Sequence, residues 1–413
     1  MPTLPQTLVL RAYDAQDDAA CRELEVRASQ FQGLGGYIKA AIYHHGSFDA
    51  KPRQYLDHIL LVVVDSQNHV VCGVVAVAIK CAYVHGKART CGYVFDLRVD
   101  ERYQRQGIGA ALTTEAEAQC KVRGVELLYL SMNKDNRKAR ALYEQQSWEL
   151  ASARTLVFRP TLFLPTAPRG AAAAAAAGGG VKQLEPARAL ELTSRYYSER
   201  ALGLTSKEMA HLFRSPMMLA TYLASDGNGS EAALSLWHGS ALTAFYPVTL
   251  LLPVTLWVRL GPWLAAAALG ATLLTCRALF RAAPGPWPLA PGPVSTALLG
   301  LTVGTAAAGL LTFGRWVSSR AAFRARSFAP VVVGPQGPAL LSVLHAHLLS
   351  EARRRGFAFV VVNEACGSVY ADVLTKKRKQ RSPTVFWQKT LTPCLGPGLS
   401  ALPTDMFFDP RDL

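Results

Sequence analysis

Two glycines one residue apart, Gly107 and Gly109, follow a basic and amide-rich run in the stretch YQRQGIGAAL, residues 103–112. The preceding residues 91–99 are rich in β-branched and aromatic side chains, which predicts a strand. Residues 110–122 are rich in Ala, Leu, Glu and Gln, which predicts a helix. Because bare backbone amides at a helix N-terminus attract anions, this junction predicts a phosphate site.

Two common phosphate motifs are excluded. The dinucleotide pattern G-x-G-x-x-G needs a third glycine where this chain has Leu112, and the loop lacks the Gly-Lys-Ser/Thr ending of the Walker pattern. The pattern that remains is Q-x-x-G-x-G, formed by Gln104, Gly107 and Gly109. On its own it is also compatible with a plain turn and helix cap.

A second pattern follows a predicted buried strand at 125–133. Residues 136–148 read NRKARALYEQQSW, and Ala139, Leu142 and Tyr143 share one face of a predicted helix. Together the two patterns resemble the motifs Q-x-x-G-x-G and N-x-x-A-x-x-L-Y-x-x-x-G-F of the GNAT superfamily of N-acetyltransferases. Ser147 and Trp148 replace the usual Gly-Phe.

The resemblance implies a GNAT fold over residues 1–165, an α/β fold with a twisted mixed sheet and helices on both faces. It also implies acetyl-CoA as the co-substrate, with the pyrophosphate on the loop amides and the pantetheine on the main chain of the preceding strand. No metal is expected. The residues implied to bind the cofactor are Leu97, Val99, Gln104, Arg105, Gln106, Gly107, Ile108, Gly109, Ala110 and Asn136.

Acetyl transfer from a thioester to an amine needs a base for the amine proton and an acid for the departing thiolate. The resemblance implies Tyr143 as the acid, and a tyrosine that only fills the core is the alternative. Asp96 is the carboxylate nearest the loop, although its neighbours Arg98 and Arg102 suit a plain ion pair equally well. Related enzymes often carry a catalytic glutamate where this chain has Tyr93, so the identity of the base stays open.

The elements that must position these residues follow from the same patterns. Strands are predicted at 8–12, 58–64, 70–79 and 155–159, and a helix at 14–31. The turn-rich residues 65–69 predict a hairpin between the second and third of these strands. This order of elements matches that of the GNAT fold.

Length and composition bound the rest. A chain of 413 residues suits two domains, and the alanine- and glycine-rich stretch 166–180 predicts a linker between them. The net charge of +15 favours acidic partners, among them CoA itself or an anionic membrane, whereas we do not expect direct nucleic-acid binding. The eight cysteines form no C-x-x-C pair, which predicts reduced cysteines in the core.

The second half contains a hydrophobic insertion at 241–328. Its stretches 246–276 and 294–314 predict two membrane crossings, since about 20 apolar residues span a bilayer. A buried helical hairpin in a globular core is the alternative. Arginines at the outer end predict that both flanking parts face the cytoplasm.

Residues 181–240 and 329–413 surround this insertion. Strands are predicted at 231–236, 329–333 and 357–363, and a helix at 338–355. This repeats the strand–helix–strand order of residues 91–133, but prolines in the loop 334–338 remove backbone donors. We therefore predict a degenerate second GNAT-like lobe without cofactor.

A closer resemblance is to the HOOKLESS-type plant acetyltransferases, whose GNAT domain precedes a C-terminal domain with a similar ending. It is carried by residues 96–99 with the QRQGIG loop, by ALSLW at 233–237 and by FFDPRDL at 407–413. The match covers 1–165 well and the tail in patches, and the alanine bias suggests an algal genome. The basic run 376–381 predicts a nuclear import signal, a membrane contact or a solvated loop, so the nucleus is the alternative to the membrane.

Three functions fit these observations. We expect an acetyl-CoA-dependent N-acetyltransferase that acts on a primary amine in a ternary complex, the amine being a protein lysine, a protein N-terminus or a small molecule. The second is a CoA-binding pseudoenzyme that serves as a regulatory or scaffold protein at a membrane. The third is a membrane carrier or assembly factor.

Overall fold

The computed structural model describes residues 4–28, 30–33, 38–44, 46–84, 86–161, 180–198, 202–239, 243–250, 324–357, 359–365, 382–391, 409 and 412. The chain divides into two compact units. Unit 1 comprises Met1–Ser29, Ile42–Ala244 and Phe323–Leu413, and unit 2 comprises Gln30–Ala41 and Phe245–Ala322. Residues 166–179 of the predicted linker (166–180) and the basic run 376–381 lie outside the described residues.

Unit 1 contains two lobes. The elements of the first lobe are β1 (Leu8–Ala12), η1 (Ala15–Asp17), α1 (Asp18–Ala28), η3 (Phe48–Ala50), η4 (Pro52–Gln54), β4 (Asp57–Asp65), β5 (Val70–Val84), β6 (Lys87–Val99), η5 (Glu101–Tyr103), α2 (Ile108–Val122), β7 (Leu127–Asn133), α3 (Arg137–Gln145) and β8 (Glu149–Pro160). Those of the second lobe are β9 (Val181–Leu184), α5 (Pro186–Ser198), β10 (Leu202–Leu204), α6 (Ser206–Arg214), β11 (Met218–Ser225), β12 (Glu231–Trp237), β14 (Arg324–Val333), α9 (Gly337–Arg354), β15 (Phe359–Ala365) and β16 (Ser382–Thr390).

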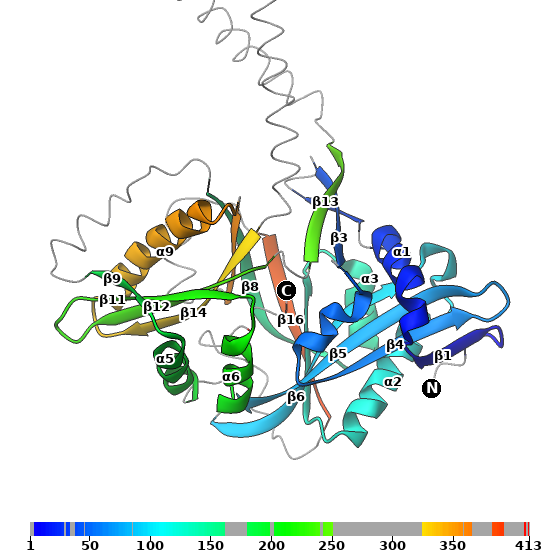
Figure 1. Ribbon diagram of the computed structural model, residues 1–413. Coiled ribbons are helices and arrows are strands. Elements are labelled where there is room, and N and C mark those ends of the chain that lie inside the picture. Colours follow the sequence, from blue (N-terminus) through cyan, green and yellow to red (C-terminus); the bar gives the residue numbers. More distant parts are fainter. Residues whose placement is uncertain are drawn as a thin grey trace, which may run out of the picture. The chain divides into compact units, whose positions relative to one another are not determined.

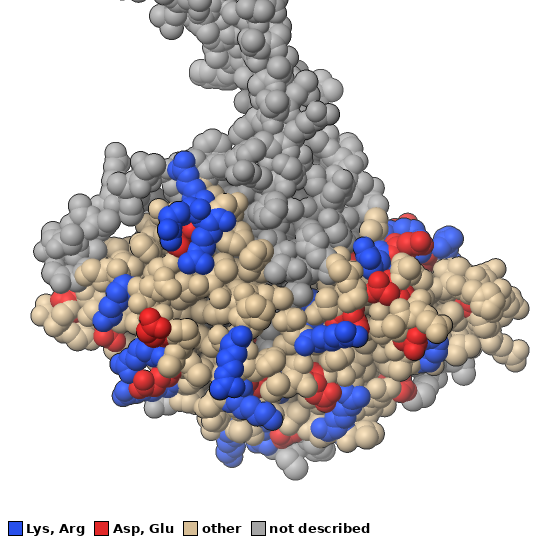
Figure 2. All heavy atoms as spheres, in the orientation of Figure 1, with Lys and Arg blue, Asp and Glu red and all other residues tan. Residues whose placement is uncertain are grey.

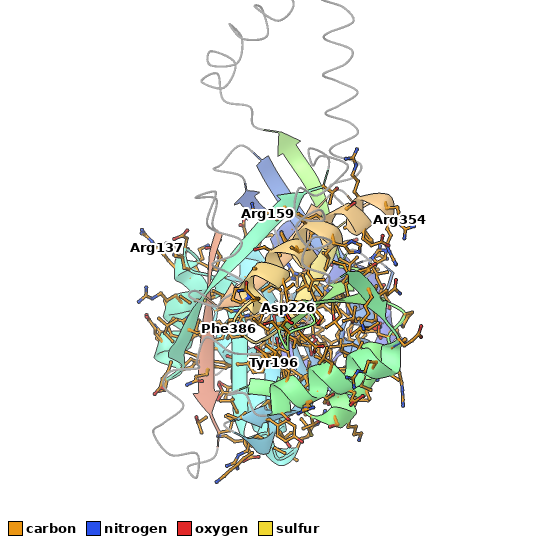
Figure 3. The ribbon with its side chains drawn as sticks, turned by 90° about the vertical axis from the view of Figure 1, so that its left-hand side faces the viewer. Arg137, Arg159, Tyr196, Asp226, Arg354 and Phe386 are labelled. Atoms are coloured by element: carbon orange, nitrogen blue, oxygen red, sulfur yellow. The ribbon has the colours of Figure 1, made fainter. Side chains whose placement is uncertain are left out.

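The strands of both lobes form one 13-stranded sheet in the order β1-β4-β5-β6-β7-β16-β8-β15-β14-β12-β11-β9, with β10 paired to β5 (Figure 1). A parallel pair lies in each half, β6 with β7 and β14 with β15. The last strand of each lobe has crossed into the other half. β16, which carries Phe386 (Figure 3), pairs with β7 and β8, while β8 also pairs with β15.

The two faces of the first lobe's sheet have separate cores because side chains alternate along a strand. We call them the α1 face and the α2 face after the helix that covers each. On β5, Val74, Ala76 and Ala78 join the core with Cys21 and Leu24 of α1. Their neighbours Val75, Val77 and Ile79 join the core with Ile108 and Leu112 of α2.

Most predicted elements are confirmed. β1 has the predicted bounds, and the strand–helix–strand order of the second lobe is confirmed as β14, α9 and β15. The helix predicted at 14–31 is wrong beyond Ala28. Residues 30–33 instead form β2, because their backbone pairs with that of 38–41 in an antiparallel ladder. The described cysteines are free, and four of them (Cys21, Cys72, Cys91 and Cys120) are buried.

A separate three-stranded sheet has the order β13-β3-β2, formed by β2 (Gln30–Gly33), β3 (Ile38–His44) and β13 (Thr243–Leu250). The start of the hydrophobic insertion is thus a strand, which contradicts a helical crossing that begins at 246. The remainder of the predicted hairpin, 251–323, lies outside the described residues. No described helix is both long and apolar enough to cross a bilayer.

Candidate active site

A bulge in β6 shapes the centre of the first lobe. Phe95 lies opposite Ala76, and Arg98 lies opposite Val74. The two residues Asp96 and Leu97 therefore both face Val75 on β5. Asp96 takes a left-handed backbone with φ 51°. A bulge re-aims side chains, and here Phe95 and Asp96 both lie toward the α1 face while Leu97 packs against the α2 core.

Beyond this point the far edge of β6 is unpaired. Its parallel ladder with β7 covers only Cys91–Val94 opposite Leu127–Leu130. Among the described strands, none pairs with Phe95–Val99 on that side. Unpaired strand edges bind extended chains through main-chain hydrogen bonds, so this edge fits an extended ligand that carries amide groups. The predicted positions Leu97 and Val99 lie on it.

The loop after β6 presents its amides to the start of α2. Arg105 and Gly107 have φ values of 66° and 79°, and Gly107 is the N-cap of the helix. The first helical hydrogen bond runs from the Ala111 amide to the Gly107 carbonyl at 2.9 Å. The amides of Ile108 to Ala110 therefore have no acceptor in the helix, and such a terminus fits a phosphate.

The equivalent loop of the second lobe is closed by its own contacts. Gly334 follows β14 with φ 76°, but the Gln336 amide donates to Ser230 Oγ at 3.3 Å and the Gly337 amide donates to the Gly334 carbonyl at 3.1 Å. Pro338 has no N–H to offer. The expectation that this lobe lacks a phosphate loop therefore has a physical basis in its geometry.

Tyr143 lies in the core on the α2 face. It is 4% exposed, stacks edge-on against Trp148 and lies in the same core as Leu97 and Val99. Burial raises the pKa of its hydroxyl, which keeps it protonated. Among the described residues the structure records no hydrogen-bond partner for this hydroxyl, so it is not fixed to a backbone carbonyl of that set.

Three predicted loop residues have structural roles of their own. Gln104 Oε1 accepts a hydrogen bond from Lys138 Nζ at 2.9 Å, which links the loop to α3. Asn136 caps α3 by accepting from the Ala139 amide at 3.2 Å. Ile108 is buried in the α2 core, and Arg105 and Gln106 are exposed. The structure thus brings the loop, Asn136's helix and Tyr143 to one end of β6.

On the α1 face, Asp96 belongs to a buried ionic cluster. His44 Nδ1 is 2.7 Å from Glu25 Oε1, and His44 Nε2 is 3.3 Å from Asp96 Oδ2. Arg98 Nη2 bridges Glu25 Oε1 at 3.0 Å and Asp96 Oδ1 at 2.8 Å. Arg102, the other expected partner of Asp96, pairs with Asp100 instead.

The cluster shifts the proton affinities of its members. Burial opposes the protonation of His44, but the carboxylates of Asp96 and Glu25 outweigh it and raise the pKa of the ring. Burial also opposes ionisation of Asp96, yet His44, Lys51 and Arg98 lower its pKa well below the usual range. Asp96 alone is therefore a weak base, since an effective base has a pKa near the working pH.

Glu25, His44 and Asp96 also have the residue types of a metal site, and their ligand atoms lie within 4.8 Å of one another. However, the Arg98 guanidinium already donates hydrogen bonds to both carboxylates of this set, to one oxygen of Glu25 and one of Asp96. It supplies the positive charge that a metal ion would bring. The donor set is thus better satisfied by Arg98 than by an ion.

A second buried cluster lies further along the α1 face. Lys80 Nζ is 2.7 Å from Asp412 Oδ1 and 3.0 Å from Asp409 Oδ2, and its side chain is only 1% exposed. The hydroxyls of Tyr55 and Tyr129 donate to the Asp412 carboxylate at 3.1 and 2.8 Å. We call this group the C-terminal clasp.

Tyr93 is part of the C-terminal clasp as well. Its hydroxyl donates to the Asp412 carbonyl, and its ring, with those of Tyr55 and Tyr129, lies 5.4–5.6 Å from Lys80 Nζ. Such distances suit cation–π attraction. Tyr93, which stands where related enzymes often carry a catalytic glutamate, therefore binds Asp412.

Sequence analysis missed Glu25, His44, Lys80 and Asp412 as site residues. In the sequence, His44 stands next to His45, and adjacent residues of a strand point to opposite sides, so the two do not read as a pair of ligands. Two signals were available. Glu25 shares the buried face of α1 with Cys21 and Leu24, and Lys80 is a lone charge within the apolar strand β5.

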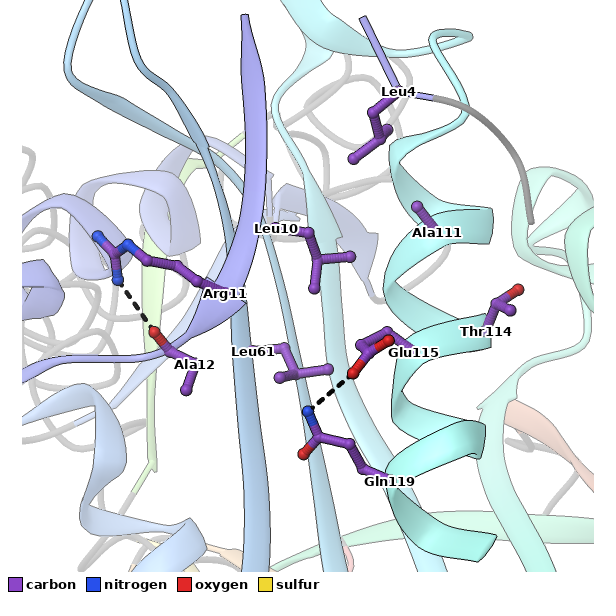
Figure 4. Close-up of a pocket in the computed structure, with 9 residues that line it drawn as sticks. All are labelled: Leu4, Leu10, Arg11, Ala12, Leu61, Ala111, Thr114, Glu115 and Gln119. Atoms are coloured by element: carbon purple, nitrogen blue, oxygen red, sulfur yellow. Dashed lines mark hydrogen bonds between the residues drawn. The ribbon is translucent and has the colours of Figure 1, made fainter. Parts of the chain in front are cut away.

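A hollow of about 370 Å³ lies elsewhere, between β1 and α2 (Figure 4). It is lined by Leu4, Leu10, Arg11, Ala12, Leu61, Ala111, Thr114, Glu115 and Gln119. A hydrogen bond of 3.0 Å joins Gln119 to Glu115 across its wall. None of the predicted site residues lines it, so it offers no support for the site described above.

The outer surface distributes its charge. On the face shown in Figure 2, Lys and Arg side chains of the described residues are interspersed with Asp and Glu. Arg354, at the outer end of α9 (Figure 3), and Arg355 both bond Glu351, at 2.8 and 2.6 Å. The net positive charge therefore does not gather into one patch on that face.

Comparison with known proteins bears on the family resemblance and on the fold. Residues 29–148 match the model of the acetyltransferase (GNAT) family. The chain is 25% identical over 332 residues to "Acetyl transferase GW6a" of Oryza sativa subsp. japonica. The match covers 78% of this chain and 67% of that protein. These matches support acetyl transfer in general.

Solved structures show the fold alone at their low identity. A GCN5-related N-acetyltransferase from Sphaerobacter thermophilus is 13% identical with a TM-score of 0.51, over 95% of this chain and 98% of that chain. Saccharomyces cerevisiae N-myristoyltransferase with bound myristoyl-CoA is 10% identical with a TM-score of 0.53, over 94% of this chain and 80% of that chain. The chain thus has a mixed α/β fold of GNAT type.

Proposed function

We propose that the protein transfers an acetyl group from acetyl-CoA to a primary amine, with both substrates bound at once in the first lobe. The observation that carries the proposal is one continuous path along the chain. It begins at the unpaired edge of β6 and runs through the left-handed loop to the free N-terminus of α2. An extended amide-bearing arm followed by a pyrophosphate has the shape and chemistry of this path.

The protein's own groups would then act from the two faces of the sheet. Amides of residues 105–110 bind the pyrophosphate, and the main chain at Leu97 and Val99 orients the arm. Tyr143, held protonated by burial on the α2 face, donates a proton to the departing sulfur. Asp96, on the α1 face, receives the amine proton.

The acidic character of the α1 face favours a cationic acceptor. Asp96 is the outermost carboxylate of its cluster, with 12% of its side chain exposed, while Glu25 behind it is fully buried. An arriving ammonium group is attracted by carboxylates of this kind. A protein lysine, a protein N-terminus and a small amine all fit, and the same test separates them.

The full-length protein tests the proposal. Calorimetry with acetyl-CoA should show binding, and a panel of amines and lysine peptides should release free CoA thiol in at least one case. Binding without turnover of any amine would instead support a CoA-binding pseudoenzyme. Absence of binding would refute the site itself.

Two glycines at opposite ends of α2 provide a matched pair of variants. Gly107 and Gly124 have φ values of 79° and 69°, so an alanine at either position costs about 1–2 kcal/mol of backbone strain. Gly107→Ala should also weaken acetyl-CoA binding at least tenfold, because it tilts the loop amides. Gly124→Ala should leave binding unchanged. Equal affinities in the two variants would contradict the loop assignment.

A further inference from the structure

The ionic cluster on the α1 face contains a histidine that the proposed reaction has not used. We propose that His44 is a positioning residue for Asp96 and takes over, through Asp96, the proton that the acceptor amine loses. This role rests on the proposed function. The base for the amine proton then lies on the α1 face, because Tyr93 stands where related enzymes often carry a catalytic glutamate and cannot act as that base.

The exposure of the three residues decreases along a line. Asp96 is 12% exposed, His44 is 1% exposed and Glu25 is fully buried. Only Asp96 can meet an acceptor, and it lies beside the unpaired edge where the thioester would sit. His44 Nε2 is 3.3 Å behind it and faces Asp96 Oδ2, so a proton can pass directly between these two atoms.

Glu25 holds the ring in the required orientation. Its Oε1 lies 2.7 Å from His44 Nδ1, and its Oε2 accepts the His44 backbone amide at 2.8 Å. A carboxylate on one ring nitrogen fixes the tautomer, so that the other nitrogen is the acceptor. The Phe48 ring packs edge-on against the imidazole, 5.3 Å away between centroids, and blocks other orientations.

Charged groups face His44 from α1 and β6, whereas η3 packs Phe48 against the ring. Glu25 comes from α1, Asp96 and Arg98 come from β6, and Lys51 precedes η4 and acts on Asp96. The two carboxylates raise the pKa of His44 against the effect of burial. The imidazole therefore binds a proton more tightly than an unperturbed histidine does, which favours transfer of a proton from Asp96 to His44.

The proton balance is complete with these groups. An ammonium acceptor and acetyl-CoA give an amide, free CoA thiol and one proton. The nitrogen loses two protons, of which one ends on the sulfur by way of Tyr143. The other passes from the nitrogen to Asp96 and on to His44, and it returns to solvent through Asp96 after the amide has left.

The test is the pH profile of kcat/KM with the best amine from the panel. His44 must be neutral to accept a proton, so activity should rise with pH through its pKa. His44→Gln keeps a side chain of similar size that does not titrate. The His44→Gln variant should lose the rise of kcat/KM with pH, and its rate should fall by roughly 10²-fold or more. Its affinity for acetyl-CoA should be unchanged. His58→Gln, a half-buried histidine on β4, should leave the profile unchanged.

A second variant keeps the test decisive if His44→Gln folds poorly. Glu25→Gln removes one of the charges that raise the His44 pKa, so the rising limb should move to lower pH. A wild-type profile in both variants would overturn the role of His44 while leaving acetyl transfer intact. Failure of the wild type to acetylate any amine would overturn both proposals. Activity that EDTA removes and Zn²⁺ restores would show a metal site and also overturn the role.

Discussion

Lys80 and Asp412 lie 332 positions apart in the chain, and their side chains meet at 2.7 Å in the core of the first lobe. Three tyrosine hydroxyls and a second carboxylate complete the C-terminal clasp around them. Burial, with Asp409 nearby, raises the pKa of Asp412, and Lys80 opposes that shift. The end of the chain is therefore part of the architecture of the first lobe.

Removing the ammonium group should destabilise the whole protein. Lys80→Met leaves carboxylates buried without their cation, which costs about 3–5 kcal/mol in such pairs. Urea unfolding should show a lower midpoint with an unchanged slope. The control is Arg188→Met, which breaks an exposed ion pair with Glu191 and should leave the midpoint where it was. Equal midpoints for both variants would mean that the clasp contributes nothing to stability.

Tyr143→Phe should separate catalysis from binding. The change keeps the ring against Trp148 and deletes only the hydroxyl, so turnover should fall by roughly 10²–10⁴-fold while acetyl-CoA affinity holds. Tyr13→Phe removes a hydroxyl that bonds Asp18 on the α1 side and serves as the matched control. Turnover near that of the wild type in Tyr143→Phe would show that this side chain only fills the core.

The His44 cluster should make stability depend on pH. The folded pKa of His44 is raised above its ordinary 6.5, so its contribution is complete below pH 6.5 and is lost as the pH rises through the folded value. The folded pKa of Asp96 is lowered below 3.8, so its contribution is complete above pH 3.8 and is lost as the pH falls through the folded value. The free-energy difference between wild type and His44→Gln should therefore be largest between these limits. A difference that grows as the pH rises above 6.5 would contradict the raised pKa.

Membrane attachment through the hydrophobic insertion stays a proposal that fractionation can decide. After lysis without detergent, the full-length chain should sediment with membranes, because residues 294–314 are long and apolar enough to span a bilayer. A variant with residues 251–323 replaced by a short Gly-Ser linker should stay in the supernatant. Recovery of the full-length chain in the supernatant would refute the attachment.

Local signals in the sequence were enough to predict the glycine loop after β6 and the two faces of β5. The left-handed Gly107 and the alternation along β5 depend on residues within one turn or one strand, so motif and periodicity predict them. The acceptor side depends on distant partners. Glu25, His44 and Asp96 come from three elements, and no spacing rule relates them.

The tail illustrates the same limit. The sequence shows the resemblance of residues 407–413 to the ending of the plant acetyltransferases. It does not show that Asp409 and Asp412 pair with Lys80, because that contact forms only when the whole chain has folded. Strand β16 was also missed, although the β-branched and aromatic run TVFW at 384–387 is typical of a strand. Its place between β7 and β8 could not be deduced, because it depends on pairing between residues that are far apart in the chain.

The exchange of β8 and β16 has a consequence for biosynthesis. The edges of β7 and β8 that receive β16 stay open until residues 382–390 leave the ribosome, since no earlier described strand covers them. At about 5–20 residues per second, that interval is roughly 10–50 seconds. Open edges of this kind invite pairing with other chains, so this interval favours misassociation of the nascent protein. A chain that is truncated before residue 382 therefore contains every motif of the first lobe but lacks the strand β16 that pairs with β7 and β8.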